Sequence, residues 1–210
     1  MRGLTEFFDI LMTLLWSVTY TLVLIGTIRY RYPLISLMGQ AIIAPFELAV
    51  VLHFIVRGNF NLSLVPLSYT YWTIFEAAII CILLKLKGLK KKELALYLLF
   101  LGAMTALMIY LVTFKGHMLI FAYANTFLGQ VFWLLLVRRK DYPMTPWTLS
   151  IFVIKFVADV ILIPVYLHMG IWINQLLCIL LPILEALFIL EYSKRKEAEF
   201  QNSASKKAKS

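Results

Sequence analysis

The sequence is poor in cysteine, and it contains no long polar stretch. Two cysteines, Cys81 and Cys178, stand inside apolar segments of the 210-residue chain. A disulfide framework needs several cysteines, and a Cys/His zinc site needs clustered ligands. No segment is polar enough, over a sufficient length, to form a separate soluble domain. A disulfide-stapled domain and a structural zinc domain are therefore both excluded.

Hydrophobic residues are abundant instead. They make up 62% of the chain, whereas soluble domains usually contain about 45–50% apolar residues. Runs of about 20 apolar residues, the length of helix that crosses a bilayer, recur along the sequence. The sequence therefore predicts an all-α membrane protein with seven transmembrane helices. We expect the spans at residues 7–28, 34–56, 68–86, 93–113, 117–138, 146–167 and 170–191.

Basic residues predict the orientation of these spans, because they concentrate on the cytoplasmic side of membrane proteins. The first, third and fifth predicted loops and the C-terminal tail carry two, five, three and six Lys or Arg residues, sixteen together. The opposite side carries three, Arg2, Arg57 and Lys115. We expect an N terminus outside and a cytoplasmic C terminus. The transmembrane domain is expected over residues 1–193 and a flexible basic tail over 194–210.

The net charge of +9 follows from these loops and the tail. Contact of basic residues with anionic lipid head groups accounts for them, and a nucleic-acid partner is not needed. We expect a multi-pass integral protein of a bacterial plasma membrane or an endoplasmic reticulum. The sequence leaves its oligomeric state open.

Ionisable side chains inside the predicted spans are the most informative feature. A charge near the bilayer centre costs at least about 2.5–3.5 kcal/mol. At 1.5 Å per residue, Glu47 and Glu76 both lie roughly 14 Å from the outer surface. A short outer loop joins their spans, so we expect the two acids to be neighbours. Lys155 and Asp159 share one face of the sixth span at i, i+4 spacing, and Glu185 lies deeper in the seventh.

Structural roles are open for each of these groups. Lys155 and Asp159 form a self-neutralising pair in one interpretation, and a single glutamic acid can hydrogen-bond between helices. Intramembrane hydrogen bonds contribute only about 0.6 kcal/mol on average, which is little against the cost of three buried glutamates. Desolvation favours the neutral acid, and a second acid nearby holds the proton more firmly. Glu47 with Glu76 is therefore predicted to donate a proton, as in acid–base catalysis or proton-coupled transport.

Aromatic residues make up 15% of the chain. Most single rings are explained by helix packing. Desolvated aromatic faces, however, stabilise a cation by roughly 2 kcal/mol or more. A buried acid beside an aromatic lining favours carbocation chemistry on an apolar substrate. The rings nearest the polar groups are Phe46, Tyr71, Trp72, Phe75, Tyr123, Phe132, Trp133 and Phe156.

Short motifs spread over residues 40–192 resemble the small seven-helix transmembrane terpene cyclases of meroterpenoid and indole-diterpene pathways, the pyripyropene-type family. That family has a Trp-Glu pair in the second span, where this chain has Phe46-Glu47. It has an acid four residues after a Trp in the third span, as Trp72 and Glu76 are here. The remaining matches are the loop Arg138-Arg139-Lys140-Asp141, the pair Lys155-Phe156, and Glu185 ahead of Tyr192.

This resemblance implies a membrane terpene cyclase whose buried acid protonates an epoxide or alkene of a prenyl chain. Glu47 would be that acid, and Glu76 and Glu185 would hold its proton state or remove the final proton. The resemblance implies a lipophilic prenylated substrate and neither a metal nor an organic cofactor. The predicted substrate pocket consists of Phe46, Trp72, Asn125, Gln130, Lys155 and Asp159.

Other functions stay open on the sequence. A small-solute or proton-coupled transporter is the main alternative, although spans 1–3 and 5–7 share no motif. A retinal protein needs a lysine in the seventh span, and none occurs between Gly170 and Leu190. A scaffold or assembly factor would tolerate neutral replacements of Glu47 and Glu76.

Overall fold

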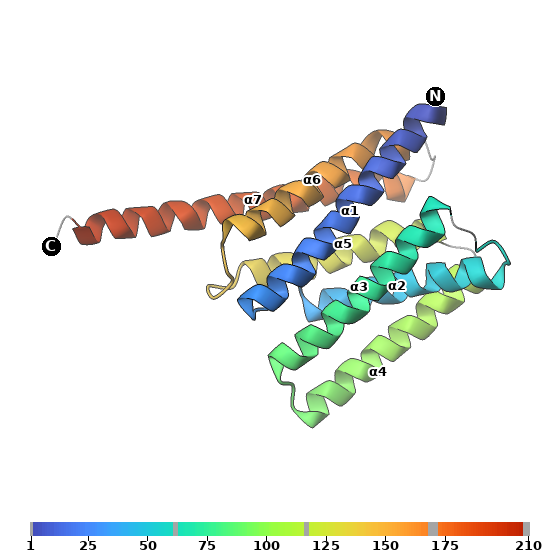
Figure 1. The fold of residues 1–210 in the computed structure, drawn as a ribbon, viewed down its shortest axis with the longest axis horizontal. Helices are drawn as coiled ribbons and strands as arrows, with labels where there is room; N and C mark the ends of the chain where they lie inside the picture. The colour runs from blue at the N-terminus through green and yellow to red at the C-terminus, as the bar shows by residue number, and fades with distance from the viewer. Residues whose placement is uncertain (1, 61–62, 116–117, 168–171, 208–210) are drawn as a thin grey trace.

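The computed structural model describes residues 2–60, 63–115, 118–167 and 172–207. Every regular element within these ranges is helical, and the chain has no strand there. A π-helical segment, η1 (Ile109–Phe114), directly continues the fourth α-helix. The α-helices, shown in Figure 1, are α1 (Arg2–Tyr30), α2 (Leu37–Val56), α3 (Leu64–Lys87), α4 (Lys91–Met108), α5 (Met118–Val137), α6 (Pro146–Leu167) and α7 (Trp172–Lys207).

The seven predicted segments are confirmed as helices. Local chemistry explains several of their ends. Ser36 caps α2 by accepting the Gly39 N–H at 3.3 Å, and Gly88 ends α3 in the left-handed conformation that glycine adopts without strain. The Lys90 N–H bonds the Glu93 carboxylate at 3.0 Å and begins α4. Helix α7 differs most from the expectation, because it continues past 191 to Lys207 without a break at 193.

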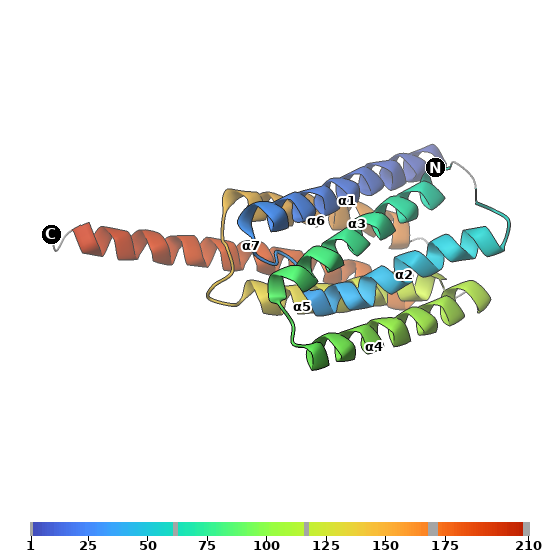
Figure 2. The same ribbon diagram turned by 60° about the horizontal axis from the view of Figure 1, so that its bottom comes forward.

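The extension of α7 is held at its base by Arg195. Its guanidinium pairs with Glu191 at 3.0 Å, one turn back on the same helix. The same guanidinium donates to the carbonyls of Val137 and Arg139, at 2.7 and 2.6 Å. These carbonyls lie at the end of α5, where helix carbonyls have no partner within the helix. Beyond this contact α7 runs on alone, away from the end that holds the N terminus (Figures 1 and 2).

Six of the helices form a ring around a common interior. Helix α1 packs against α3 and α6, α6 against α7, α7 against α5, α5 against α2, and α2 against α3. The predicted neighbours α2 and α3 are thus confirmed. Helix α4 and η1 lie outside the ring and pack on α2 (Figure 2). The ring brings residues far apart in sequence to one interior.

Two glycines set the approach of α2 and α5. A Cβ atom on Gly39 would lie 2.8 Å from the carbonyl oxygen of Gly129, and one on Gly129 would collide with the Ile43 side chain. Each helix therefore presents bare backbone to the other. This close packing of small residues is common between helices in membranes, where lipid provides no hydrophobic force for association.

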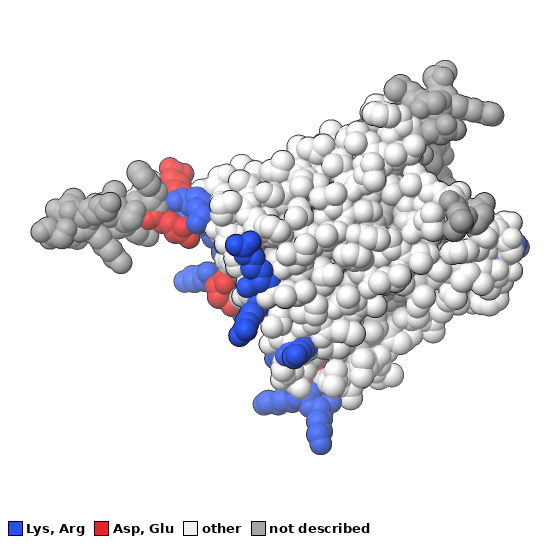
Figure 3. Space-filling model, in the orientation of Figure 1, with Lys and Arg blue, Asp and Glu red and all other residues white. Residues whose placement is uncertain are grey.

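The distribution of polarity is the reverse of that in a soluble protein. Large apolar side chains point outward, such as Leu99 at 70% exposure and Ile74 at 61%, while Glu76 and Glu185 are fully buried. Soluble monomers rarely expose continuous apolar surface beyond a few hundred Å². In Figure 3 most of the visible face carries no charge, and basic residues gather at one end.

Five of the described helical segments are long and apolar enough to cross a membrane. Phe121–Val137 of α5 is a shorter apolar helix, and α6, which carries Lys155 and Asp159, is not among the five. The chain is therefore compatible with a multi-pass membrane protein. The five segments are Ile10–Tyr30, Leu37–Val56, Leu64–Lys87, Lys91–Phe114 and Gln175–Glu199.

The glycine contact predicts a selective loss of stability. Gly39→Ala should destabilise the protein by about 1–3 kcal/mol, because the new methyl group meets backbone that has no rotamer to change. Gly102→Ala is the matched control, since a Cβ there meets nothing within 4 Å. Thermal unfolding of the purified variants in detergent measures both effects. Equal melting temperatures would contradict the close approach of α2 and α5.

Candidate functional site: a cavity inside the helix ring

A cavity of about 40 Å³ lies inside the ring, between α1, α2, α5 and α6. This volume holds only a few water molecules or one small chemical group, so a larger ligand has to displace side chains. The lining residues include polar ones, but the surface that they present to the cavity is almost wholly apolar. The described lining residues are Trp16, Thr19, Tyr20, Val23, Ile35, Gln40, Ile43, Thr126, Gly129, Gln130, Trp133 and Lys155.

Tyr20 links this cavity to a pair of buried glutamates, Glu47 and Glu76. The Tyr20 hydroxyl donates to Glu47 Oε1 at 2.7 Å. Glu76 lies near enough to interact electrostatically with both residues, as their shared depth predicted. Glu47 Oε2 and both Glu76 oxygens have no hydrogen-bond partner within the described part of the chain. We name these three residues the acid cluster.

No ion pair joins either glutamate of the acid cluster to a base among the described residues. Glu47 is 2% exposed and Glu76 is fully buried. A carboxylate buried without a counter-charge is strongly disfavoured, and two adjacent carboxylates also repel each other. The arrangement therefore favours a cluster that retains at least one proton.

A second cluster forms around Lys155. Its Nζ lies 3.1 Å from Asp159 Oδ2 and 3.5 Å from Glu185 Oε1. Gln130 Nε2 donates to the same Asp159 oxygen at 3.2 Å. We name Gln130, Lys155, Asp159 and Glu185 the ion-pair cluster. Its one cation faces two carboxyl groups, so it is neutral when one acid holds a proton and carries one negative charge when neither does.

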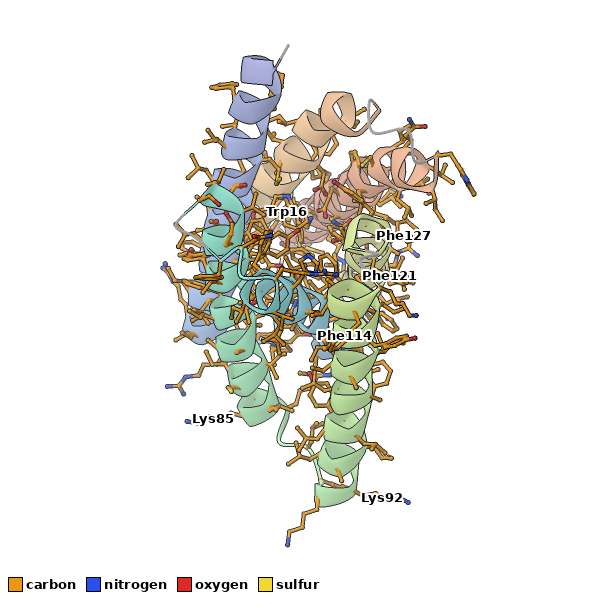
Figure 4. The ribbon with its side chains drawn as sticks, turned by 90° about the vertical axis from the view of Figure 1, so that its right-hand side faces the viewer. Trp16, Lys85, Lys92, Phe114, Phe121 and Phe127 are labelled. Atoms are coloured by element: carbon orange, nitrogen blue, oxygen red, sulfur yellow. The ribbon has the colours of Figure 1, made fainter. Side chains whose placement is uncertain are left out.

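Aromatic rings lie between the two clusters. The Lys155 Nζ is 4.3 Å from the centre of the Trp16 ring, and Trp16 packs on Trp72 at 5.8 Å. Trp72 also stacks on Tyr20 at 6.2 Å and donates its ring N–H to Ser17 Oγ at 3.0 Å. Trp16 lies well inside the bundle in Figure 4, whereas Lys85 and Lys92 lie at the far ends of α3 and α4. These rings form an aromatic wall.

Two residues of the predicted pocket lie elsewhere. Phe46 packs edge-on against Tyr69 at 6.1 Å and belongs to an apolar cluster with residues of α4 and η1. The Asn125 side chain donates to Met108 Sδ at 3.4 Å. Neither residue is among the described residues that line the cavity. Trp72 and Asp159 do not line it either, but each contacts residues that do.

The Arg-Arg-x-Asp loop also lies apart from the cavity. Arg139 pairs with Asp141 through two hydrogen bonds, at 3.1 and 3.0 Å, and both side chains are more than half exposed. The hydrogen bond from Arg139 lowers the pKa of Asp141 below its ordinary value. This pair stabilises the connection between α5 and α6.

Sequence reasoning did not select Trp16, Tyr20 or Gln40, which all line the cavity. Trp16 and Tyr20 are spaced i, i+4 in the first span, which places them on one helix face. That spacing does not reveal that Tyr20 meets Glu47, because the two residues belong to helices that are not neighbours in the ring. A signal for Gln40 existed in the repeated dipeptides Gly39-Gln40 and Gly129-Gln130.

Comparison of the chain with family models, curated proteins and solved structures gives no match. The fold and the cavity define an all-helical protein with a polar interior, and its function is inferred from that interior.

Removing the cation of the ion-pair cluster is predicted to destabilise the fold. Lys155→Met should cost about 3 kcal/mol or more, because two buried carboxyl groups lose their counter-charge. Adding Asp159→Asn should restore part of the loss, and the exposed Lys87→Met is the control. Thermal unfolding of these three variants, of Asp159→Asn alone and of the parent measures this. Additive destabilisation by the two changes would show that the ion pair is not a unit.

Proposed function

We propose that the chain crosses the membrane seven times, with its N terminus outside and its C terminus in the cytoplasm. The position of the basic residues supports this topology. Those at the end of α1, between α3 and α4, between α5 and α6, and on α7 gather at one end of the bundle (Figure 3). Basic loops favour the cytoplasmic side. The cavity then lies within the bilayer.

Labelling of single cysteines tests the topology. In a background without Cys81 and Cys178, the Asn59→Cys variant should react with a membrane-impermeant maleimide on intact cells. The Lys140→Cys variant should react only after the membrane is opened. Both positions are exposed, so access to the reagent decides the result. The reverse pattern would overturn the orientation, and equal labelling from one side would overturn the number of spans.

We further propose that the cavity catalyses acid-initiated cyclisation of a prenyl chain on a lipophilic substrate. The acid cluster carries this proposal, because its Tyr20–Glu47 hydrogen bond connects a buried carboxyl group to the cavity wall. Tyr20 lies on the wall and Glu47 behind it. In the proposed step the Tyr20 O–H, which donates to Glu47 in the structure, turns to donate to the substrate while the protonated Glu47 donates to the Tyr20 oxygen. The resemblance to membrane terpene cyclases at Glu47, Trp72 and Glu76 supports the same assignment.

The reaction balances without a metal or an organic cofactor. Protonation of an epoxide oxygen breaks its bond to carbon, or protonation of an alkene forms a C–H bond, and either leaves a carbocation. Successive alkenes of the chain attack it, so that each ring closure forms one C–C bond and moves the positive charge. Loss of a proton from the last cation to a carboxylate forms a double bond. The product is an isomer of the substrate, because the proton gained in the first step is lost in the last.

The groups around the cavity suit the middle and the last steps of this reaction. The aromatic wall of Trp16, Tyr20 and Trp72 offers ring faces that stabilise a moving cation. Glu185 and Asp159 provide carboxylates that can take up the final proton. Lys155 does not repel the cation strongly, because both acids offset its charge. Binding of a prenyl chain requires the small cavity to widen.

Replacement of the acid tests the proposal. Membranes containing the parent protein should convert farnesyl- or geranylgeranyl-bearing aromatic compounds, with or without a terminal epoxide, to products of unchanged mass and new retention time. Glu47→Gln should lower this rate at least 100-fold, the range typical of a lost general acid. Tyr20→Phe should lower it too, while Glu199→Gln on the exposed end of α7 should not. Chromatography with mass spectrometry follows each product, and parent-level turnover by Glu47→Gln would disprove the acid role.

A proton-coupled transporter is the second candidate function, and the ion-pair cluster favours it. Buried networks of lysine and carboxylates also serve as proton relays in transporters. In that case proteoliposomes should show solute uptake that depends on a proton gradient and is lost in Asp159→Asn. No isomeric product would then form with any prenylated compound.

A further inference from the structure

The connection between α3 and α4 carries the densest positive charge in the chain. Five lysines stand there within eight residues, and each has an exposed side chain. Among the described residues no carboxylate forms an ion pair with any of them. The nearest acid along the chain is Glu93, and its carboxylate bonds the Lys90 N–H at 3.0 Å. The lysine cluster, as we name this group, consists of Lys85, Lys87, Lys90, Lys91 and Lys92.

Other basic residues at the same end of the bundle are engaged by groups of the protein itself. Arg139, Arg195 and Lys196 each pair with a nearby carboxylate. The Arg29 guanidinium lies 5.9 Å from the centre of the Trp147 ring. General contact with lipid head groups accounts for any basic loop of a membrane protein. The lysine cluster differs from the other loops in having five cations whose charge the described part of the chain does not offset.

This arrangement costs stability in two ways. Like charges that lie close together repel one another. Lys90 also caps the start of α4, and Lys91 and Lys92 lie in its first turn, where the helix dipole is positive and disfavours cations. Glu93 is the one acid in that turn. An anion among the lysines relieves both costs.

Exposed apolar surface adjoins the lysine cluster on both helices. Lys92, Leu96 and Leu99 share one face of α4 at i, i+4 and i+7 spacing, and the two leucines are 57% and 70% exposed. On α3, the exposed Ile74 lies three helical turns before Lys85 on the same face. Lys85 and Lys92 lie at the same end of the bundle in Figure 4. Each helix therefore presents an apolar stripe that ends in a lysine.

We propose that the lysine cluster binds the phosphate head group of an anionic phospholipid whose acyl chains lie along the exposed leucines of α4. The unpaired lysines select a negative head group, and the apolar stripe selects a lipid over a soluble anion. A second copy of the chain does not fit, because its own lysine cluster carries the same charge. The bound lipid offsets the repulsion among the lysines and covers α4, the least buried of the five spanning segments. This site goes beyond the proposed function and does not depend on the chemistry of the cavity.

Three matched probes test the site on the full-length protein in neutral maltoside micelles. Dioctanoyl phosphatidic acid has the anionic phosphate and the acyl chains, dioctanoyl phosphatidylcholine has the same chains on a zwitterionic head group, and glycerol phosphate has the anion alone. Titration followed by native mass spectrometry should show saturable binding of the phosphatidic acid. The other two probes should bind at least tenfold more weakly.

Replacement of the lysines should remove this binding. The triple variant Lys90→Gln, Lys91→Gln, Lys92→Gln should weaken it about 100-fold, because each lysine near an anionic lipid changes the affinity about fivefold. The matched control is a second triple variant, Arg138→Gln, Lys140→Gln, Lys194→Gln. It removes the same charge from exposed positions at the same end of the bundle and should bind like the parent.

Melting temperatures test the repulsion separately. Without lipid, the Lys90–Lys92 triple variant should melt at or above the temperature of the parent, because the removed cations opposed the helix dipole. Saturating phosphatidic acid should raise the melting temperature of the parent and of the control, but not that of the triple variant. A triple variant that melts well below the parent without lipid would contradict the repulsion on which the proposal rests.

Each other outcome of the titrations overturns the proposal. Equal binding of glycerol phosphate would mean a site for a soluble anion, and equal binding of phosphatidylcholine would mean that the chains alone bind. Equal loss of affinity in the control variant would mean that diffuse charge attracts the lipid without a defined site. Tighter binding of a polyglutamate peptide than of the phosphatidic acid would mean that an acidic protein segment occupies the lysine cluster.

Discussion

The ion pairs of Lys155 with Asp159 and Glu185 are the interaction on which the polar interior of this protein depends. A single charge in an apolar medium is expensive, and the cost falls only when a partner of opposite sign lies beside it. The three charged groups come from α6 and α7, and Gln130 extends the cluster to α5. The cluster therefore ties three helices of the ring together. The low dielectric constant of the surroundings strengthens the attraction between these charges. Removal of one member therefore leaves the others buried without their counter-charge.

The acid cluster avoids the free-energy cost of a buried charge in a different way. Glu47 and Glu76 have no ion-pair partner in the part of the chain that the structure describes, so retention of a proton takes the place of ion pairing. The ring thus holds two kinds of carboxyl group, one kind beside a lysine and one kind beside a tyrosine, with aromatic rings between them. Neighbouring acids in unlike environments are the usual basis for separate donor and acceptor roles. Tyr20 and Lys155, which contact one kind each, both line the cavity.

The sequence predicted much of this arrangement, because membrane burial leaves few alternatives for polar residues. Hydrophobic run lengths and basic loops predicted seven helices, and the depth of Glu47 and Glu76 predicted that they meet. The i, i+4 spacing predicted the Lys155–Asp159 pair. What could not be predicted was the order of helices around the ring, which decides that Tyr20 reaches Glu47 and that Glu185 reaches Lys155.

The same limit explains the positions of Phe46 and Asn125. Both have the depth of the polar groups, but depth does not say toward which neighbour a side chain points. Helix α4 and η1 pack on α2 outside the ring, and Phe46 clusters with their apolar residues and with Tyr69 of α3. Asn125 donates to Met108 of α4, so neither residue lines the cavity. Likewise, α7 continues past residue 193, where contacts of the tail such as the Arg195–Glu191 ion pair support the helix. The lengths of hydrophobic runs in the sequence do not reveal such contacts.

Arg195 has a mechanical consequence for the interior. Its guanidinium donates to the carbonyls of Val137 and Arg139, and so joins the base of the α7 extension to the end of α5. Gln130 lies two helical turns before Val137 on that same helix. The projecting part of α7 is therefore connected, through Arg195, to a helix that lines the cavity.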